Sequence, residues 1–213
     1  MATITTILWD VGGVLLTNGW DRKGRAALQS QFGLDHDVFE ERHEMSNDAW
    51  EKGLITIEEY LRKTVFHEPR NFTPDDFIAA MKAQSQVLGD SALGILGNLA
   101  ASESVFIGML NNESRELNDY RIDKFSLRNY FKVFLSSCNV GLRKPDTDIF
   151  RLALNILQQD GDSVAFVDDR PGNVQAANEV GIHGIRYQGS ENLKTELERL
   201  GITLAAEAGS RTV

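Results

Sequence analysis

Residues 7–15 read Ile7-Leu8-Trp9-Asp10-Val11-Gly12-Gly13-Val14-Leu15, an apolar run that stops at a carboxylate and is followed by two glycines. This pattern is typical of a short buried strand that ends in a tight turn. In an open parallel sheet, ligands bind at the carboxyl ends of the strands. Asp10 is therefore placed to attack a substrate or to hold a metal, although an acid that merely begins a turn would give the same pattern.

A second apolar run, over residues 163–169, ends in the adjacent acids Asp168 and Asp169. Two adjacent carboxylates at a buried strand end raise each other's pKa, so a cation is needed to neutralise them. Oxygen ligands alone favour Mg²⁺. Between the two runs lies Lys144, a fixed cation ahead of a predicted helix. In this order the acids and the lysine indicate a phosphoryl-transfer site that begins with Asp10.

These motifs, in this order, resemble those of the haloacid dehalogenase superfamily of hydrolases. Within it the chain is most similar to small bacterial sugar-phosphate phosphatases and to the phosphatase domain of bifunctional soluble epoxide hydrolases. The resemblance is densest over residues 131–200, where SCNVGLRKP (137–145) and VDD (167–169) match. The resemblance implies that Asp10 is the nucleophile and that Lys144 holds the nucleophile and the phosphoryl group together. It also implies that Asp168 and Asp169 serve Mg²⁺, and that Asn111 and Asn112 occupy the phosphate-binding motif after the second core strand.

The chain departs from the family pattern at two positions. Most family phosphatases carry a second Asp two residues after the nucleophile, where it protonates the leaving group and later activates water, and this chain has Gly12 there. Loss of a general acid typically lowers a rate by a factor of about 10² to 10⁴. A glycine at position 12 is also compatible with a backbone of positive φ. Asn111 stands where Ser or Thr is usual, and its amide can still donate a hydrogen bond.

From these residues we expect a Mg²⁺-dependent phosphatase that acts on a small phosphorylated metabolite through an aspartyl-phosphate. The expected metal ligands are Asp10, the Gly12 carbonyl and Asp169, with Asp168 bound directly or through water. Gly12 should make the rate depend on leaving-group acidity, so that acyl, aryl and sugar 1-phosphates react faster than alkyl phosphates. One alternative is a catalytically weakened binding or regulatory protein that kept the pocket. Another is a 2-haloacid dehalogenase, which needs an Asp nucleophile but no metal.

Composition limits the partners and the location of the protein. The 213 residues carry a net charge of −9, which would repel nucleic acid. The chain contains no run of about 18 apolar residues, so no membrane span is predicted. The chain begins without the charged and apolar regions of a signal peptide, and its single cysteine, Cys138, cannot form an internal disulfide. We therefore expect a cytoplasmic protein that binds a small molecule; the sequence does not indicate an oligomeric state.

Periodicity divides the chain into two parts. Strand and helix patterns alternate from residue 90 onward, which predicts a doubly wound parallel (Rossmann-like) α/β sheet. Between residues 17 and 89 only helical spacing occurs, over 21–32, 36–46, 57–66 and 74–88. We therefore predict a core domain of residues 1–16 and 90–213 with an inserted all-helical cap domain of residues 17–89. Ala205 to Val213 is predicted to be a frayed tail.

A cap above the strand ends can exclude water and select the substrate. Its candidate specificity residues are Trp20, His43, Met45 and Trp50. Aromatic residues at helical spacing pack in an interior more often than they contact a ligand, so packing is the competing interpretation for each of them.

Overall fold

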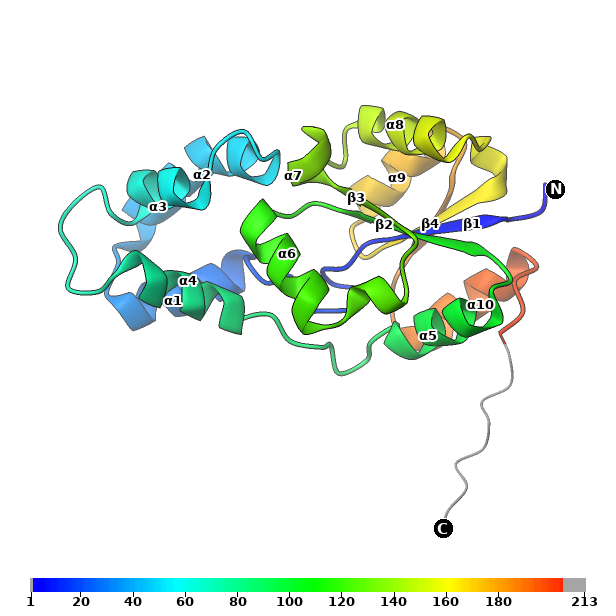
Figure 1. The fold of residues 1–213 in the computed structure, drawn as a ribbon, viewed down its shortest axis with the longest axis horizontal. Coiled ribbons are helices and arrows are strands. Elements are labelled where there is room, and N and C mark those ends of the chain that lie inside the picture. The colour runs from blue at the N-terminus through cyan, green and yellow to red at the C-terminus, as the bar shows by residue number, and fades with distance from the viewer. Residues whose placement is uncertain (1, 205–213) are drawn as a thin grey trace, which may run out of the picture.

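The computed structural model describes residues 2–204, which form a Rossmann-like α/β unit and a group of four helices (Figure 1). Five parallel strands lie in the order β3-β2-β1-β4-β5. The predicted fold class, a doubly wound parallel sheet with inserted helices, is confirmed. The strands are β1 (Thr6–Trp9), β2 (Phe106–Asn111), β3 (Val133–Ser136), β4 (Val164–Asp168) and β5 (His183–Arg186).

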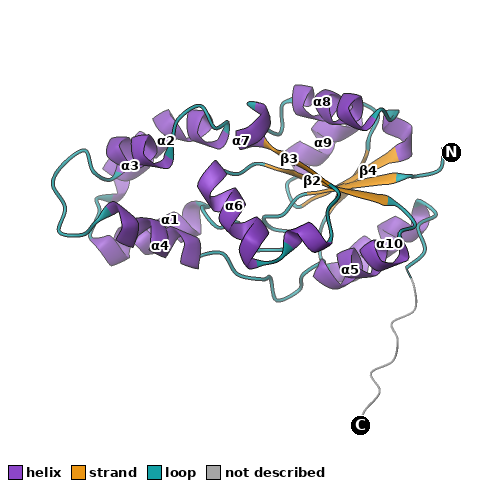
Figure 2. Cartoon of the chain, viewed as in Figure 1, coloured by secondary structure: helices purple, strands orange, loops and turns teal. Residues whose placement is uncertain are grey.

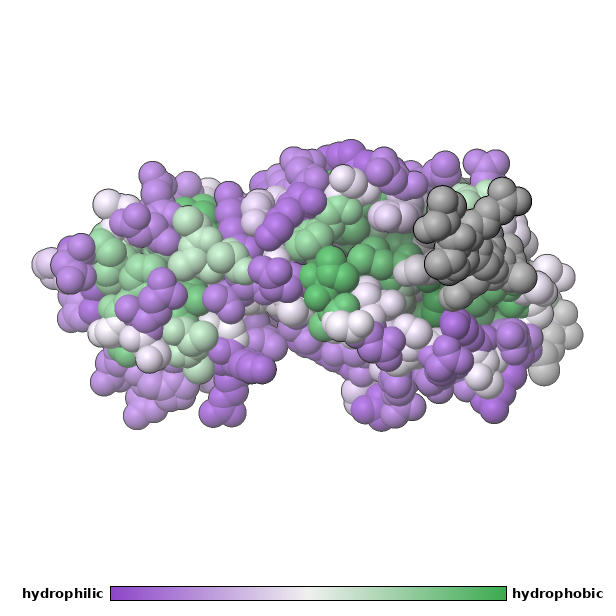
Figure 3. Space-filling view, turned by 90° about the horizontal axis from the view of Figure 1, so that it is seen from below, coloured by the Kyte–Doolittle hydropathy of each residue, from purple (hydrophilic) through white to green (hydrophobic). Residues whose placement is uncertain are grey.

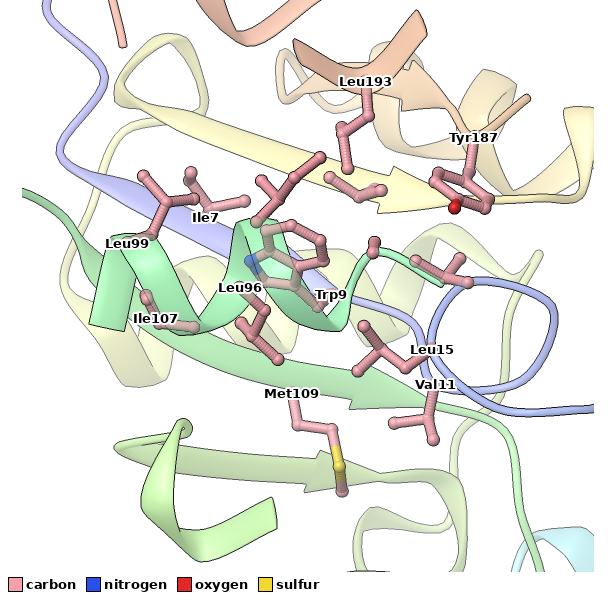
Figure 4. Packing of buried hydrophobic residues seen from close by; sticks show 14 of the residues in the cluster. Ile7, Trp9, Val11, Leu15, Leu96, Leu99, Ile107, Met109, Tyr187 and Leu193 are labelled. Atoms are coloured by element: carbon pink, nitrogen blue, oxygen red, sulfur yellow. The ribbon is translucent and has the colours of Figure 1, made fainter. Parts of the chain in front are cut away.

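Helices cover both faces of this sheet (Figure 2). Successive side chains of a strand point to opposite faces, so Trp9 packs with α5 and α10 on one face while Leu8 packs with α8 and α9 on the other. Figure 4 shows Trp9 surrounded by apolar side chains of α5 and β2. Helices of the sheet unit are α5 (Leu93–Ser102), α6 (Arg115–Lys124), α7 (Ser137–Val140), α8 (Thr147–Leu157), α9 (Pro171–Glu179) and α10 (Ser190–Arg199), with the short 3₁₀ turns η1 (Leu127–Asn129) and η2 (Gly161–Ser163).

The four remaining helices lie between β1 and α5 in the chain and pack around a separate apolar cluster, to which Leu117 of α6 also contributes. They are α1 (Arg22–Phe32), α2 (His36–Glu51), α3 (Ile57–Thr64) and α4 (Pro74–Ala83). Capping boxes at Thr56 and Thr73 fix the starts of α3 and α4, and Pro74 takes the first turn of α4. In the cluster Trp50 stacks on Tyr60 with ring centroids 4.0 Å apart.

Two segments of chain connect the four helices to the sheet unit, and they run side by side. Thr17 N donates to Gln86 O at 2.8 Å, Leu88 N donates to Leu15 O at 3.2 Å, and Leu16 pairs with Val87. Both connections therefore leave the sheet unit at one place. In space-filling view the molecule narrows between its two parts, and each part is bordered by hydrophilic residues (Figure 3).

The element boundaries differ from the predicted ones at three places. Helix α2 continues to Glu51 rather than ending at residue 46, and residues 84–88 form the returning connection rather than the end of a helix. Residues 137–140 form the short helix α7, which periodicity did not indicate. The predicted frayed tail lies outside the described residues. No helix within residues 2–204 is long and apolar enough to cross a membrane.

Candidate active site

The two acidic strand ends meet because β1 and β4 are neighbours in register. Trp9 pairs with Val167, and Asp10 N donates to Val167 O at 2.9 Å. Asp10 and Asp168 are the next residues along these two neighbouring strands, so both lie at the same edge of the sheet. Asp10 is 7% exposed and Asp168 is fully buried. The sequence prediction that both acids share one sheet edge is therefore met by the register of these two strands.

Lys144 lies between the two acids and is 1% exposed. Its ammonium is 3.0 Å from Asp10 Oδ1 and 2.6 Å from Asp168 Oδ2, and it donates to Leu110 O at 2.9 Å. Burial alone would lower the pKa of this lysine, but the charges of Asp10 and Asp168 outweigh burial and raise it. Lys144 is therefore a fixed cation that holds both carboxylates.

Asn112 fixes the backbone of Lys144 from two sides. Lys144 N donates to Asn112 Oδ1 at 2.9 Å, and Asn112 Nδ2 donates to Lys144 O at 2.7 Å. Both ends of the amide are thus in use, although Asn112 also lines the cavity at the site. Its side chain positions the lysine, and a role in phosphate binding stays a prediction.

Asn111 is 2% exposed and its amide is directed into the protein. Its Nδ2 donates to Asn118 Oδ1 at 3.0 Å, and its Oδ1 is buried without a hydrogen-bond partner. Asn111 does not line the cavity beside Asp10. In this conformation the donor that the sequence assigned to phosphate is used by Asn118, so this assignment also stays a prediction.

Three carboxylates gather where a metal ion would be held. One oxygen each of Asp10, Asp168 and Asp169 lie within 4.8 Å of one another. Burial raises the pKa of Asp10 to about 7, although Lys144 opposes it. Burial also raises the pKa of Asp169, and the charge of Asp168 adds to this effect. One lysine does not neutralise three acids, so the cluster favours a cation.

The three acids differ in how much of their hydrogen-bonding capacity is free. Asp168 accepts from Lys144 Nζ, from Asn173 Nδ2 and from the backbone N–H of Arg170, which uses both of its oxygens. Asp169 Oδ1, by contrast, is buried without a hydrogen-bond partner. Asp169 therefore has a free oxygen for a cation, and Asp168 is better suited to act through water.

A polar cavity of about 50 Å³ opens beside Asp10. It has space for a few water-sized groups. Its walls come from the strand ends, from the first connection to the four helices and from the end of α2. They are formed by Asp10, Gly12, Asn18, Trp20, Asp21, Glu51, Asn112, Glu113, Arg121, Lys144, Arg170 and Asn173. A larger cavity of about 270 Å³, bordered by Phe106 and Tyr130, lies at the opposite, amino end of β2.

Of the candidate specificity residues, the structure places Trp20 at the cavity and the others away from it. Trp20 is 8% exposed. His43 and Trp50 are buried within the helical cluster and do not line the cavity, while Met45 is 72% exposed. Trp50 is buried because helix α2 extends past residue 46 and places this side chain against Tyr60. Substrate contact by any of these residues stays a prediction.

A buried ion pair at the cavity was missed from the sequence. Glu113 Oε2 lies 3.0 Å from Arg121 Nη1, and both side chains are buried. Arg121 also donates from Nη2 to Thr17 O at 2.8 Å and from Nε to Ser85 Oγ at 3.1 Å. One guanidinium thus joins both connections of the helical part to the site. An arginine within a polar helical stretch has no signal in the sequence that distinguishes it from a solvated one.

A second set of contacts joins the end of α2 to the sheet unit. Arg143 Nη2 lies 2.8 Å from Glu51 Oε2, and Ser137 Oγ donates to Glu51 O at 2.6 Å. Gly53 approaches Cys138 so closely that an added Cβ would clash with its carbonyl. The two parts of the molecule are therefore in contact above the acids. Cys138 itself is buried, which raises the pKa of its thiol to about 12 and keeps it from acting as a thiolate.

His43 gives the helical part a pH-dependent stability. The Trp20 indole donates to Tyr60 Oη at 2.9 Å, and Tyr60 Oη forms a hydrogen bond of 2.8 Å with His43 Nδ1. Burial and the charge of Arg25 lower the pKa of His43 to about 4, against the weaker opposing effect of Glu40. In the unfolded chain the pKa returns to its usual 6.5, so unfolding takes up a proton below that pH.

We therefore expect the fold to lose stability through His43 as the pH falls from 7 towards 4. The free energy of unfolding contributed by this residue should drop by about 2 kcal/mol at pH 5. The check is urea unfolding of the native protein and of His43→Gln at pH 7 and pH 5. The difference in stability between the two proteins should shrink by that amount, and an unchanged difference would show that His43 titrates normally.

A model of the haloacid dehalogenase-like hydrolases matches residues 4–181 of the chain. The chain is 30% identical over 181 residues to flavin mononucleotide hydrolase 1, a chloroplast protein of Arabidopsis thaliana, which covers 82% of this chain and 70% of that protein. It is 31% identical over 74 residues to bifunctional epoxide hydrolase 2 of Sus scrofa, covering 35% of this chain and 13% of that protein.

Solved structures with the same fold include an enzyme of this family from Bacteroides thetaiotaomicron. It superimposes with a TM-score of 0.78 at 22% identity, over 92% of this chain and 99% of that one. A structure of the same enzyme in complex with magnesium and inorganic phosphate gives a TM-score of 0.73, over 87% of this chain and 95% of that one. At this identity the likeness shows the fold.

Proposed function

The chain belongs to the haloacid dehalogenase-like hydrolases, and from this premise we propose that it is a Mg²⁺-dependent phosphatase of a small phosphorylated metabolite. The observation that carries the proposal is the buried Lys144 ammonium, which lies within 3.0 Å of both Asp10 and Asp168 beside an unpartnered oxygen of Asp169. A fixed cation and free carboxylate oxygens at one sheet edge suit the binding and transfer of a phosphoryl group.

Asp10 is the proposed nucleophile. One of its carboxylate oxygens attacks phosphorus, the bond between phosphorus and the leaving oxygen breaks, and the leaving oxygen keeps the electron pair and takes a proton from water. Water then attacks the phosphorus of the aspartyl-phosphate and loses its proton to solvent. The bond to Asp10 breaks, the carboxylate is restored and phosphate is released. Lys144 holds the Asp10 carboxylate in place and offsets charge on the transferring oxygens.

Mg²⁺ fits the acids of this site. The unpartnered Asp169 Oδ1 supports Asp169 as a direct ligand beside Asp10, with Asp168 acting through water and the Gly12 carbonyl as a further proposed ligand. When bound, the ion supplies positive charge that draws the phosphate to the acids and keeps the Asp10 carboxyl ionised.

The four helices α1–α4 are the proposed cap over this site, within the boundaries 17–89 that the sequence predicts. The contact of Arg143 with Glu51 and the Arg121 hydrogen bond to Thr17 support a closed position above Asp10. In that position the cavity of about 50 Å³ has space for a few water-sized groups, roughly those of a phosphoryl group. A substrate as large as the flavin mononucleotide in the name of the Arabidopsis relative would need the cap to open.

A second candidate is a binding or regulatory protein that retains the pocket and turns over slowly. Gly12 and the inward-directed amide of Asn111 favour it. The two candidates differ in one measurement. Phosphate release from a panel of aryl, acyl, sugar and alkyl phosphates, with Mg²⁺ and with EDTA, supports the phosphatase if it is catalytic and metal-dependent. Binding of vanadate without turnover of any ester supports the second candidate, and turnover of haloacids that survives EDTA contradicts both.

Replacing Asp169 by Asn should weaken Mg²⁺ binding, because the amide keeps the size of the side chain but removes a charged oxygen. Mg²⁺ should raise the unfolding temperature of the native protein, and a 100-fold excess over the dissociation constant corresponds to about 2.7 kcal/mol. The shift should be largely lost in Asp169→Asn.

Exposed Asp119 supplies the matched control, because Asp119→Asn changes the same charge away from the site. The native shift should persist in this variant. A full Mg²⁺ shift in Asp169→Asn would contradict the proposed ligand.

A further inference from the structure

The space that a side chain on Gly12 would fill is already occupied. Asn18 Oδ1 lies 2.8 Å from the position of a Cβ at Gly12, and Asn18 Cα and Cγ lie 3.5 and 3.7 Å from it. The backbone does not require glycine here, since the positive φ of this turn, 77°, belongs to Gly13. Gly12 therefore packs against Asn18, and the expectation of a positive φ at this glycine is wrong.

The amide of Asn18 is half-buried at the cavity and has free donors. It lines the same cavity as Asp10 and Gly12. Its side chain makes no hydrogen bond to any residue between 2 and 204. An amide carries two N–H donors and a carbonyl acceptor on a neutral group. A polar side chain without a protein partner, lining the same cavity as Asp10, is available to a ligand in this cavity.

The backbone on both sides of Asn18 is held in place. Arg121 donates to the carbonyl of Thr17, and Trp20 N donates to the carbonyl of Asn18 at 2.6 Å. Gly19 has a φ of 60°, and a Cβ there would clash with the Arg121 guanidinium. The ion pair of Arg121 with Glu113 thus fixes the residue next to Asn18, so that little ordering is needed when the amide meets a ligand.

We propose that Asn18 is a catalytic residue that donates a hydrogen bond from its amide to the leaving oxygen, in the place of the carboxyl absent from position 12. The inference rests on the proposed phosphatase function. In an in-line transfer the attacking and leaving oxygens lie on opposite sides of phosphorus, so the leaving oxygen faces the cavity wall across from Asp10. The amide transfers no proton. The leaving oxygen takes the electron pair of the broken bond, is stabilised by the Asn18 N–H and receives its proton from water.

The test is the dependence of rate on the leaving group. In Asn18→Ala the kcat/KM for alkyl phosphates, which reports the step in which the leaving group departs, should fall by about 10- to 100-fold. The kcat/KM for aryl phosphates with acidic leaving groups should fall much less. Asn18→Ser, which keeps a donor, should recover part of the loss. Asn129→Ala truncates an exposed asparagine away from the site and should match the native protein.

If Asn18 had a purely structural role, Asn18→Ala would lower kcat/KM by the same factor for every substrate. That result, or no loss at all, would overturn the inference but not the proposed phosphatase function. A native protein that releases phosphate from no ester would instead overturn the proposed function.

Discussion

Lys144→Ala is expected to abolish turnover and to lower the free energy of unfolding by about 3–5 kcal/mol, the cost of removing one partner from a buried ion pair. Lys144 is the cation between Asp10 and Asp168, all three side chains are buried, and no second cation contacts both acids among the described residues. Without the ammonium, two carboxylates remain close together in a medium that solvates them poorly. The variant should therefore lose stability and phosphate affinity together.

Urea unfolding without metal and phosphate release with Mg²⁺ measure the two effects. Lys132→Ala removes an exposed lysine and should leave both unchanged. Cys138→Ser should also be nearly silent, because the neutral thiol it replaces has no role in the site. If Lys144→Ala is as stable as the native protein, Asp10 and Asp168 share a proton or a cation from solvent. Lys144 is then not the group that neutralises these two acids.

The positions of the acids could be predicted because they follow from the sheet itself. An apolar run that ends in Asp10 and another that ends in Asp168 must bring both to the same edge if the strands are parallel, whatever their separation in the chain. The same regularity made the fold class predictable. Lys144 was predictable from its motif, but the two hydrogen bonds by which Asn112 holds its backbone were not, since they depend on a loop contact 32 residues apart.

What the sequence could not predict depends on side chains that meet across the two parts of the molecule. Arg121 and Asn18 are more than a hundred residues apart and become neighbours only because both connections of the four helices α1–α4 pass beside α6. Helix α2 continues past residue 46 to Glu51, where the contacts with Arg143 and Ser137 oppose fraying. Periodicity reports how each segment buries its own apolar face, and it contains no information about such contacts.

Asp10→Asn is expected to lower turnover by about 10⁴- to 10⁶-fold, the loss seen when a nucleophile is removed from an enzyme of covalent mechanism. An amide is a poor nucleophile, so the first step fails. The fold should survive, in contrast to Lys144→Ala. Burial raises the pKa of Asp10 to about 7, which shows that the site disfavours its charge, and Lys144 still has Asp168 as a partner. The free energy of unfolding should therefore change by no more than about 1 kcal/mol.

The intermediate distinguishes Asp10 from every other acid of the site. Gly12 leaves no carboxyl beside the nucleophile to activate water. With an aryl phosphate, whose leaving group departs without an acid, the aspartyl-phosphate should therefore form faster than it hydrolyses. A burst of leaving group and a phosphorylated protein in acid-quenched mass spectra should follow in the native protein and in Asp119→Asn, and both should be absent from Asp10→Asn. If Asp10→Asn retains the burst, the nucleophile is another residue. If the native protein turns over without a burst, water is activated by a group other than the one missing at position 12, and hydrolysis of the intermediate does not limit the rate.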